Sequence, residues 1–136
     1  MKTIIFFLFL LILQNFSFAG NNNLILLCEG TEEMVFYPIE KNIIDETVSK
    51  LVTVTYNFKN NVLVSKHLFL NAAKCDFREN TINCRMQDNY GNYRAVTIDR
   101  ISGSTNDDNR TPYEIDGKKS VHRHFEGVCK TAKNKF

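Results

Sequence analysis

The fold is decided by one stretch of the chain, Val48-Ser49-Lys50-Leu51-Val52-Thr53-Val54-Thr55-Tyr56-Asn57-Phe58. Its even-numbered positions are apolar except Lys50, and its odd-numbered positions are polar except Leu51. Successive side chains of a β-strand point to opposite faces of the sheet, so this alternation predicts a half-buried strand. The stretch is also rich in valine and threonine, whose branched side chains favour strands.

The next stretch, residues 62–70, repeats the alternation and predicts a second strand. Its apolar face is formed by Val62, Val64, Leu68 and Leu70, interrupted by Lys66. A two-residue connection, Asn60-Asn61, would place Lys59 opposite Val62 and so set a polar face against an apolar one. We therefore predict a three-residue loop, Lys59-Asn60-Asn61, which pairs Phe58 with Val62.

The same reasoning predicts strands along the rest of the chain. They are Leu24–Glu29, Met34–Ile39, Tyr93–Ser102, His122–Cys129 and a hairpin that pairs residues 74–78 with residues 81–85. Leu24–Glu29 is nearly continuously apolar, which indicates burial on both faces or a position where a barrel closes. A total of about eight strands predicts an all-β fold, a small antiparallel barrel or sandwich.

Two segments are predicted to depart from this strand pattern. Residues 40–50 also fit a short helix, because Ile43, Ile44, Thr47, Val48 and Leu51 share one helical face. Residues 102–120 lack apolar alternation, which predicts a long exposed loop. Long loops on rigid barrels often carry binding residues, so this loop is the predicted contact surface, with Ser102, Gly103, Ser104 and Tyr113 as its candidate residues.

Residues 1–19 have the features of a secretory signal peptide. Lys2 precedes an apolar run from Ile4 to Leu13, and Ser17-Phe18-Ala19 supplies the small residues that precede a cleavage site. The run is shorter than the roughly 20 residues that span a bilayer. We therefore expect cleavage after Ala19, no membrane anchor afterwards, and a single domain of residues 20–136 that is periplasmic or secreted.

The composition restricts the classes of partner. The 136 residues fit one domain, and the net charge of +2 is too small to imply a nucleic-acid partner. The signal segment holds five of the eleven phenylalanines, so the remaining domain has less apolar content than the whole chain suggests. Covalent cross-links would help to stabilise such a domain.

The four cysteines, Cys28, Cys75, Cys84 and Cys129, all lie in the exported part of the chain. Their even number in an oxidising compartment indicates two disulfides, and the absence of close cysteine pairs argues against zinc. A hairpin around Glu79-Asn80 would place Cys75 directly opposite Cys84. The remaining pair, Cys28 and Cys129, would then join the first strand to the last.

Several polar residues are candidates for a chemical role. His122, His124 and Glu126 alternate on one predicted strand, so the two histidines could contribute to a weak metal site, but no third ligand is evident. An exposed polar strand face is the simpler interpretation, and His67 is read as an outward residue of its strand. Arg100 is predicted to point inward and to fix backbone carbonyls or a carboxylate near the barrel rim. The cluster Asn106-Asp107-Asp108-Asn109 is read as a solvated turn.

Four features occur together and suggest a family. They are the signal peptide, the segment Leu27-Cys28-Glu29-Gly30, the segment Ile98-Asp99-Arg100-Ile101-Ser102-Gly103, and the ending Gly127-Val128-Cys129 with Lys135-Phe136. The combination resembles a group of small exported proteins of proteobacteria and their phages that share an I-D-R-x-S-G … G-x-C … K-F ending. This resemblance implies an exported β-protein and no particular activity.

A second likeness is to periplasmic inhibitors of C-type lysozyme, which are small disulfide-bonded β-barrels with the loop motif S-G-x-x-Y. Here Ser102-Gly103-Ser104-Thr105 is followed by Asn106 where the motif has tyrosine, and the nearest downstream tyrosine is Tyr113. This likeness implies that residues 102–120 would contact a lysozyme.

The sequence contains no nucleophile elbow, phosphate-binding loop, dinucleotide fingerprint or metalloprotease motif. We therefore expect a protein without enzymatic activity or a cofactor, which binds another protein or a small apolar ligand through the rim of its barrel. Lysozyme inhibition and weak metal binding through His122 and His124 are the alternatives.

Overall fold

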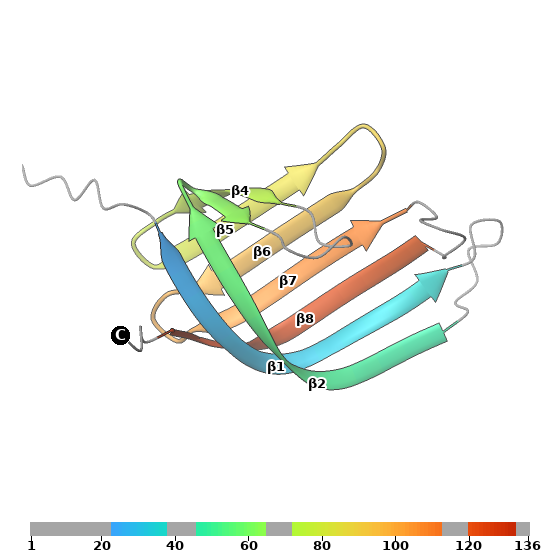
Figure 1. Ribbon diagram of the computed structural model, residues 1–136, viewed down its shortest axis with the longest axis horizontal. Helices are drawn as coiled ribbons and strands as arrows, with labels where there is room; N and C mark the ends of the chain where they lie inside the picture. The colour runs from blue at the N-terminus through green and yellow to red at the C-terminus, as the bar shows by residue number, and fades with distance from the viewer. Residues whose placement is uncertain (1–22, 38–45, 65–71, 113–119, 133–136) are drawn as a thin grey trace, which may run out of the picture.

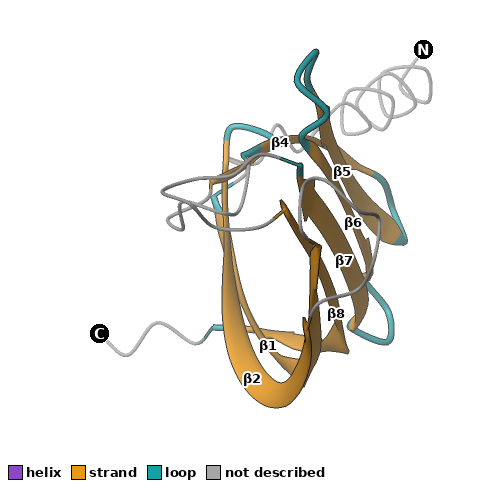
Figure 2. Ribbon diagram, turned by 90° about the vertical axis from the view of Figure 1, so that its right-hand side faces the viewer, coloured by secondary structure: helices purple, strands orange, loops and turns teal. Residues whose placement is uncertain are grey.

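The computed structural model describes residues 23–37, 46–64, 72–112 and 120–132. These residues form eight antiparallel strands that pair in chain order and close into a barrel around a common interior (Figures 1 and 2). The strands are β1 (Leu24–Tyr37), β2 (Glu46–Lys59), β3 (Val62–Val64), β4 (Ala73–Phe77), β5 (Thr81–Gln87), β6 (Tyr93–Asp99), β7 (Ser104–Thr111) and β8 (Ser120–Thr131). The all-β prediction is confirmed, and the fold is a barrel and not a sandwich.

β1 is a single long strand, although the sequence predicted two separate strands over the same region. The strand continues through Gly30, which lies opposite Gly127 of β8. A Cβ atom at Gly30 would overlap the backbone carbonyl of Glu126, so the missing side chain lets β1 and β8 approach closely. β1 pairs with both β2 and β8 and thus closes the barrel. Its apolar sequence had two interpretations, burial on both faces or a position at barrel closure, and the second is confirmed.

β7 is the main departure from prediction, because residues 104–111 were expected to belong to a long exposed loop. Instead they form a strand whose inward side chains are all polar and buried, namely Thr105, Asp107, Asn109 and Thr111. The number of strands was therefore predicted correctly through two errors that cancel: β1 had been divided in two, and β7 had been overlooked.

The connection between β2 and β3 is a two-residue turn, so the predicted three-residue loop is wrong. Lys59 pairs with Val62 and Phe58 with Leu63. Asn60 and Asn61 have φ angles of 50° and 60°, as a tight hairpin turn requires, and asparagine tolerates this left-handed conformation. Leu63 is the inward residue of β3, so Val62 and Val64 face outward and not into the core as the alternation suggested.

The helix considered near residues 40–50 does not form over residues 46–50, which belong to β2. Residues 40–45 lie outside the described part of the chain, as do the predicted signal peptide at 1–19, His67, Leu68, Leu70, Tyr113 and the terminal Lys135-Phe136. Among the described residues there is no helix that is long and apolar enough to cross a membrane.

The apolar core fills one half of the barrel interior. Phe58 and Phe77 pack edge to face with ring centroids 5.5 Å apart, and the rings of Tyr56 and Phe125 lie 6.4 Å apart. The rest of the core is formed by Leu26, Cys28, Leu63, Ala73, Ile82, Cys84, Val96 and Ile98. Tyr56 and Phe58 are buried on the face of β2 that the period-two pattern assigned to the interior, whereas the buried residue of β3 is Leu63 and not Val62 or Val64.

Both predicted disulfides are confirmed. Cys75 is bonded to Cys84 within the β4–β5 hairpin, where Phe77 also pairs with Ile82 as expected. Cys28 is bonded to Cys129, which joins β1 to β8 across the seam where the barrel closes. The described residues contain no free cysteine.

The two ends of the barrel differ. Three tight connections, Asn60–Asn61, residues 78–80 and residues 100–103, lie together at what we call the turn end, on the left of Figure 1. At the opposite end, which we call the loop end, the described chain leaves β1 at Tyr37, β3 at Val64 and β7 at Pro112.

Candidate functional site

The β6–β7 connection at the turn end contains two of the predicted contact residues, Ser102 and Gly103, and the third, Ser104, follows as the first residue of β7. The Asp99 carboxylate accepts hydrogen bonds from the backbone N–H groups of Ile101 (2.9 Å) and Ser102 (2.7 Å). These N–H groups hold the pKa of the Asp99 carboxyl below its usual value, that of Ser102 having the larger effect. Asp99 therefore stays ionised and keeps the turn closed at neutral pH.

Gly103 attaches this turn to the body of the barrel. Its φ angle is +78°, and a Cβ atom there would collide with the carbonyl oxygen of Cys129. Its N–H donates to the carbonyl of Asp99 (2.8 Å), and its own carbonyl accepts from the N–H of Cys129 (2.8 Å). Because Cys129 is bonded to Cys28, the turn rests on a covalently closed part of the barrel.

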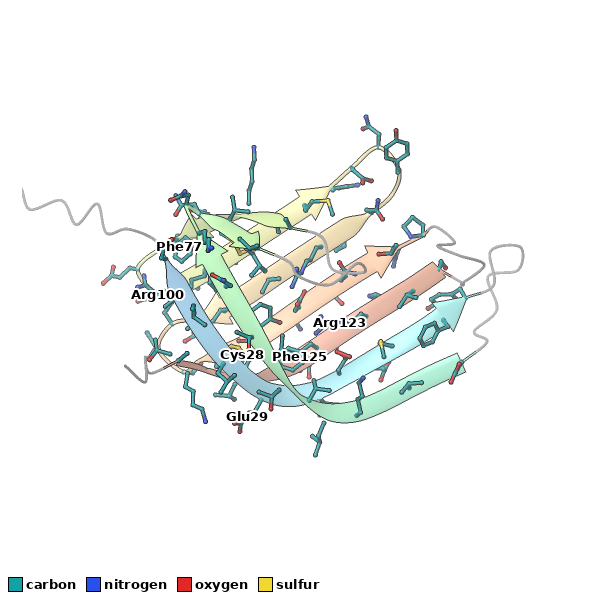
Figure 3. The ribbon with its side chains drawn as sticks, in the orientation of Figure 1. Cys28, Glu29, Phe77, Arg100, Arg123 and Phe125 are labelled. Atoms are coloured by element: carbon teal, nitrogen blue, oxygen red, sulfur yellow. A yellow bond between two sulfur atoms is a disulfide. The ribbon has the colours of Figure 1, made fainter. Side chains whose placement is uncertain are left out.

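Arg100 does not point into the barrel as predicted. It is exposed in the turn, and its Nη1 donates a hydrogen bond to the carbonyl oxygen of Arg78 (2.6 Å). Figure 3 places Arg100 close to Phe77, at the same end of the barrel. The predicted role, fixing a backbone carbonyl at the rim, is confirmed, and it couples two neighbouring turns of the turn end.

The tip of this turn exposes apolar surface. Ile101 is 79% exposed, and Val128 on the adjoining part of β8 is 59% exposed. Val128 pairs with Ser104 in the β7–β8 ladder, and its Cγ1 would lie 3.3 Å from a Cβ atom at Gly103. Ile101 and Val128 therefore present apolar surface to solvent at this end of the barrel.

The predicted contact surface is nevertheless divided. β7 carries the chain from Ser104 at the turn end to Thr111 at the loop end. Tyr113, the fourth candidate residue, lies outside the described residues. Asn106, which stands where the lysozyme-inhibitor motif has tyrosine, is an exposed residue on the outer face of β7.

A buried network of charges, which the sequence reasoning missed, occupies the half of the interior towards the loop end. Asp107 is fully buried, and its carboxylate accepts hydrogen bonds from both Nε (3.1 Å) and Nη2 (2.9 Å) of Arg94. Arg123 Nη1 (3.1 Å) and the Tyr56 hydroxyl (2.8 Å) donate to the same carboxylate. Figure 3 labels Arg123 beside Phe125, whose ring centroid lies 5.8 Å from the guanidinium carbon.

The network of ion pairs continues from Arg123 to charged residues of β1 and β2. Arg123 Nε donates to Glu32 on β1 (2.9 Å), and Lys50 on β2 lies 3.7 Å from the other oxygen of Glu32. Burial raises the pKa of the Asp107 carboxyl, but its hydrogen bonds with Arg94 and the charges of Arg94 and Arg123 outweigh that effect and lower it. Asp107 is therefore an ionised carboxylate between two arginines.

A signal for this network was present in the sequence. Arg94 alternates with Val96 and Ile98, and Arg123 alternates with Phe125, so both arginines occupy inward positions of apolar strands. A buried guanidinium requires a carboxylate, and that requirement could have identified Asp107 as an inward residue. The interpretation of residues 106–109 as a solvated turn is wrong for this reason.

The histidines of β8 lie on the outer face of the barrel, in agreement with their interpretation as part of a polar outer strand face. His124 Nδ1 lies 2.9 Å from Asp108 Oδ1, and His124 Nε2 lies 3.1 Å from Glu126 Oε1. His122 Nε2 lies 3.3 Å from the same Asp108 oxygen. Burial lowers the pKa of His124, but the hydrogen bonds with Asp108 and Glu126 outweigh it and the pKa is raised. In its doubly protonated form the imidazolium can donate a hydrogen bond to each of the two carboxylates.

The described residues contain no group of three or more histidine, cysteine, aspartate or glutamate side chains arranged to hold a metal ion. Asp107 and Asp108 point to opposite faces of β7, so they cannot share a cation. His122 and His124 are engaged with carboxylates, and the geometry favours an ion-paired outer face over a metal centre at these residues.

Comparisons with known proteins add no family. Neither family models, curated proteins nor solved structures match this chain. Among the described residues, the turn formed by residues 99–104 is the surface feature that best supports a function. That turn combines an exposed apolar tip, two serines and a backbone fixed by hydrogen bonds on both sides.

Proposed function

We propose that this chain is an exported, non-enzymatic binding protein that inserts the turn of residues 99–104 into a cleft of another protein. The observation that carries this proposal is the 79% exposure of Ile101 on a turn whose backbone is held by the Asp99 carboxylate and by β8. A loop that is already ordered loses little conformational entropy on binding, so an apolar anchor on it contributes most of its contact energy to affinity.

A protein partner is favoured over a small apolar ligand. Apolar ligands of barrels bind in the interior, whereas the apolar half of this interior is occupied by fully buried side chains such as Phe58, Ile82 and Phe125. Ile101 and Val128, both exposed, lie outside the interior at the turn end. The two disulfides support an oxidising compartment, and export is part of the proposal.

Site-specific photo-crosslinking tests this function. A photo-reactive amino acid replaces Ile101 in one variant, and Tyr90 in a matched control, because Tyr90 is 69% exposed on a turn at the loop end. In an extract of the exported fraction we expect one discrete product from position 101 and none of that mass from position 90. Excess wild-type protein should suppress the product, whereas excess Ile101→Asp protein should not. Equal labelling from both positions, or no competition by wild type, would refute the proposal.

Lysozyme inhibition is the second candidate, favoured by the position of Ser102-Gly103-Ser104 in this rigid exposed turn. The probe is C-type lysozyme acting on cell-wall substrate in the presence of purified protein. Inhibition is expected with wild type and should be lost with Ile101→Asp, while Leu51→Asp on the distant outer face of β2 should inhibit as wild type does. Full lysozyme activity at a large excess of wild type excludes this candidate but leaves the crosslinking result to decide the general function.

A further inference from the structure

Among the described residues, most of one edge of β2 has no strand partner. It pairs with β1 from Glu46 to Phe58, but with β3 only from Asn57 to Lys59. Within the described part of the chain, no strand pairs with residues 46–56 on the side away from β1. Figure 1 draws the first part of β2 as the outermost ribbon at the bottom of the molecule. Such an edge offers its backbone N–H and C=O groups to another extended chain.

The β1–β8 disulfide identifies which residues of β2 present those groups. The Cα atoms of Cys28 and Cys129 are 3.9 Å apart, so they form a pair that exchanges no backbone hydrogen bonds. The backbone groups of Cys28 therefore point to its other neighbour, Val54 on β2. The alternation along an antiparallel ladder then directs the even-numbered residues of β2 to β1 and the odd-numbered residues to the open edge.

The odd-numbered residues also face outward, and none of them carries a charge. They are Thr47, Ser49, Leu51, Thr53 and Thr55. Leu51 is 85% exposed, the largest exposure among the described large apolar side chains. Edge strands often carry charged side chains or proline that discourage pairing; between Thr47 and Thr55 the one charged residue is Lys50, whose Nζ lies 3.7 Å from Glu32 on the other face.

We propose that this edge pairs with the same edge of a second copy of the chain, antiparallel, about a two-fold axis through Leu51. In that register Leu51 faces Leu51 of the second copy, Ser49 faces Thr53, and Thr47 faces Thr55. No charged residues stand directly opposite one another, because Lys50 faces Val52. The five edge residues of each copy can form about ten backbone hydrogen bonds.

A second copy is the occupant because the edge is self-complementary. A two-fold interface brings the same patch of each subunit together, so the spacing of donors and acceptors matches by construction. The same operation covers the exposed Leu51 side chain with its equivalent, which removes apolar surface from water at the centre of the contact. The contact lies on β2 and leaves the turn of residues 99–104 free to bind its own partner.

Sedimentation velocity over a concentration series tests the proposal with purified, disulfide-bonded protein. Wild type should sediment as a dimer that dissociates on dilution. Leu51→Lys and Leu51→Glu should each be monomeric, because like charges would meet at the axis. An equimolar mixture of the two variants should restore a dimer, since lysine then faces glutamate. Ile25→Lys, a similar change at an exposed apolar residue of β1, should leave the dimer intact.

A backbone variant separates strand pairing from side-chain contact. Thr53→Pro removes an N–H group that points to the open edge and not to β1, so the barrel should keep its near-ultraviolet circular dichroism while the dimer is lost. Three results would overturn the proposal: a wild-type monomer at every concentration, a dimer that persists in Leu51→Lys, or a mixture of the charged variants that stays monomeric. Circular dichroism of each variant confirms that monomers are folded.

Discussion

Asp107 shows at the scale of single residues why the interior holds charge. Its carboxylate is completely buried, yet it is satisfied by Arg94, Arg123 and Tyr56, which come from three other strands. A buried ion pair adds little net stability, but removing one partner leaves the others charged, desolvated and unpaired. Asp107 therefore adds little net stability by itself, but its removal would leave two buried arginines without their carboxylate partner.

We expect Asp107→Asn to lower the free energy of unfolding by about 3–5 kcal/mol, because two guanidiniums would then face a neutral amide. Tyr56→Phe, which removes one hydrogen bond from the same carboxylate, should cost about 1 kcal/mol. Urea denaturation of both variants at neutral pH gives the comparison. A cost for Asp107→Asn no greater than that for Tyr56→Phe would contradict the arrangement of charges described above.

The same residue predicts a dependence of stability on pH. The folded-state pKa of Asp107 is lowered relative to the unfolded chain, where an aspartate titrates near pH 4. Its contribution is therefore fully present above about pH 4 and is lost as the pH falls through the lowered folded-state pKa. The acid side of the stability profile should be flatter in Asp107→Asn than in wild type.

At the scale of elements, β1 and β8 depend on two glycines that face each other. Gly30 and Gly127 form a register pair at the point where an added Cβ would overlap the backbone of the neighbouring strand. The pair lies within a strand of fourteen residues, Leu24–Tyr37, that pairs with both β2 and β8.

Gly30→Ala should therefore destabilise the protein by about 1–3 kcal/mol through overpacking at the β1–β8 seam. Thr31→Ala changes an exposed outward side chain of the same strand and should stay within about 0.5 kcal/mol of wild type. Urea unfolding measures both changes, and amide exchange of β8 should accelerate only in Gly30→Ala. Equal effects of the two substitutions would show that the close approach is dispensable.

For the molecule as a whole, a disulfide covalently joins β1 and β8, the two strands between which the barrel closes. The disulfide of Cys28 and Cys129 spans 101 residues of sequence, whereas that of Cys75 and Cys84 spans 9. The longer loop restricts the unfolded chain more strongly, by about 4.7 kcal/mol against about 3 kcal/mol or less for the shorter one. The first disulfide also supports the turn of residues 99–104, because Gly103 is hydrogen-bonded to Cys129.

We expect the double variant Cys28→Ala/Cys129→Ala to lose about 1–2 kcal/mol more unfolding free energy than Cys75→Ala/Cys84→Ala. Chemical denaturation of the two variants under oxidising conditions makes this measurement, with wild type as the reference. A larger loss from the short hairpin disulfide would show that local geometry, and not constraint of the unfolded chain, determines the stabilisation.

The sequence by itself determined the all-β class, the inward face of β2 and the pairing of all four cysteines. Those features depend on local alternation and on residues that are neighbours in a hairpin, as Cys75 and Cys84 are. It also located the turn of Ser102, Gly103 and Ser104, but placed it in a loop that extends too far.

Only the tertiary structure decided that Ser104–Thr111 is a strand, because its inward residues are polar and no local pattern marks them for burial. Asp107 can be buried only where Tyr56, 51 positions away in sequence, and two arginines converge on it. Such convergence is a property of the closed barrel, since it requires side chains from β2, β6, β7 and β8 to meet in one interior. Local sequence fixes the direction of a side chain, whereas its partners are fixed by the way distant strands close around it.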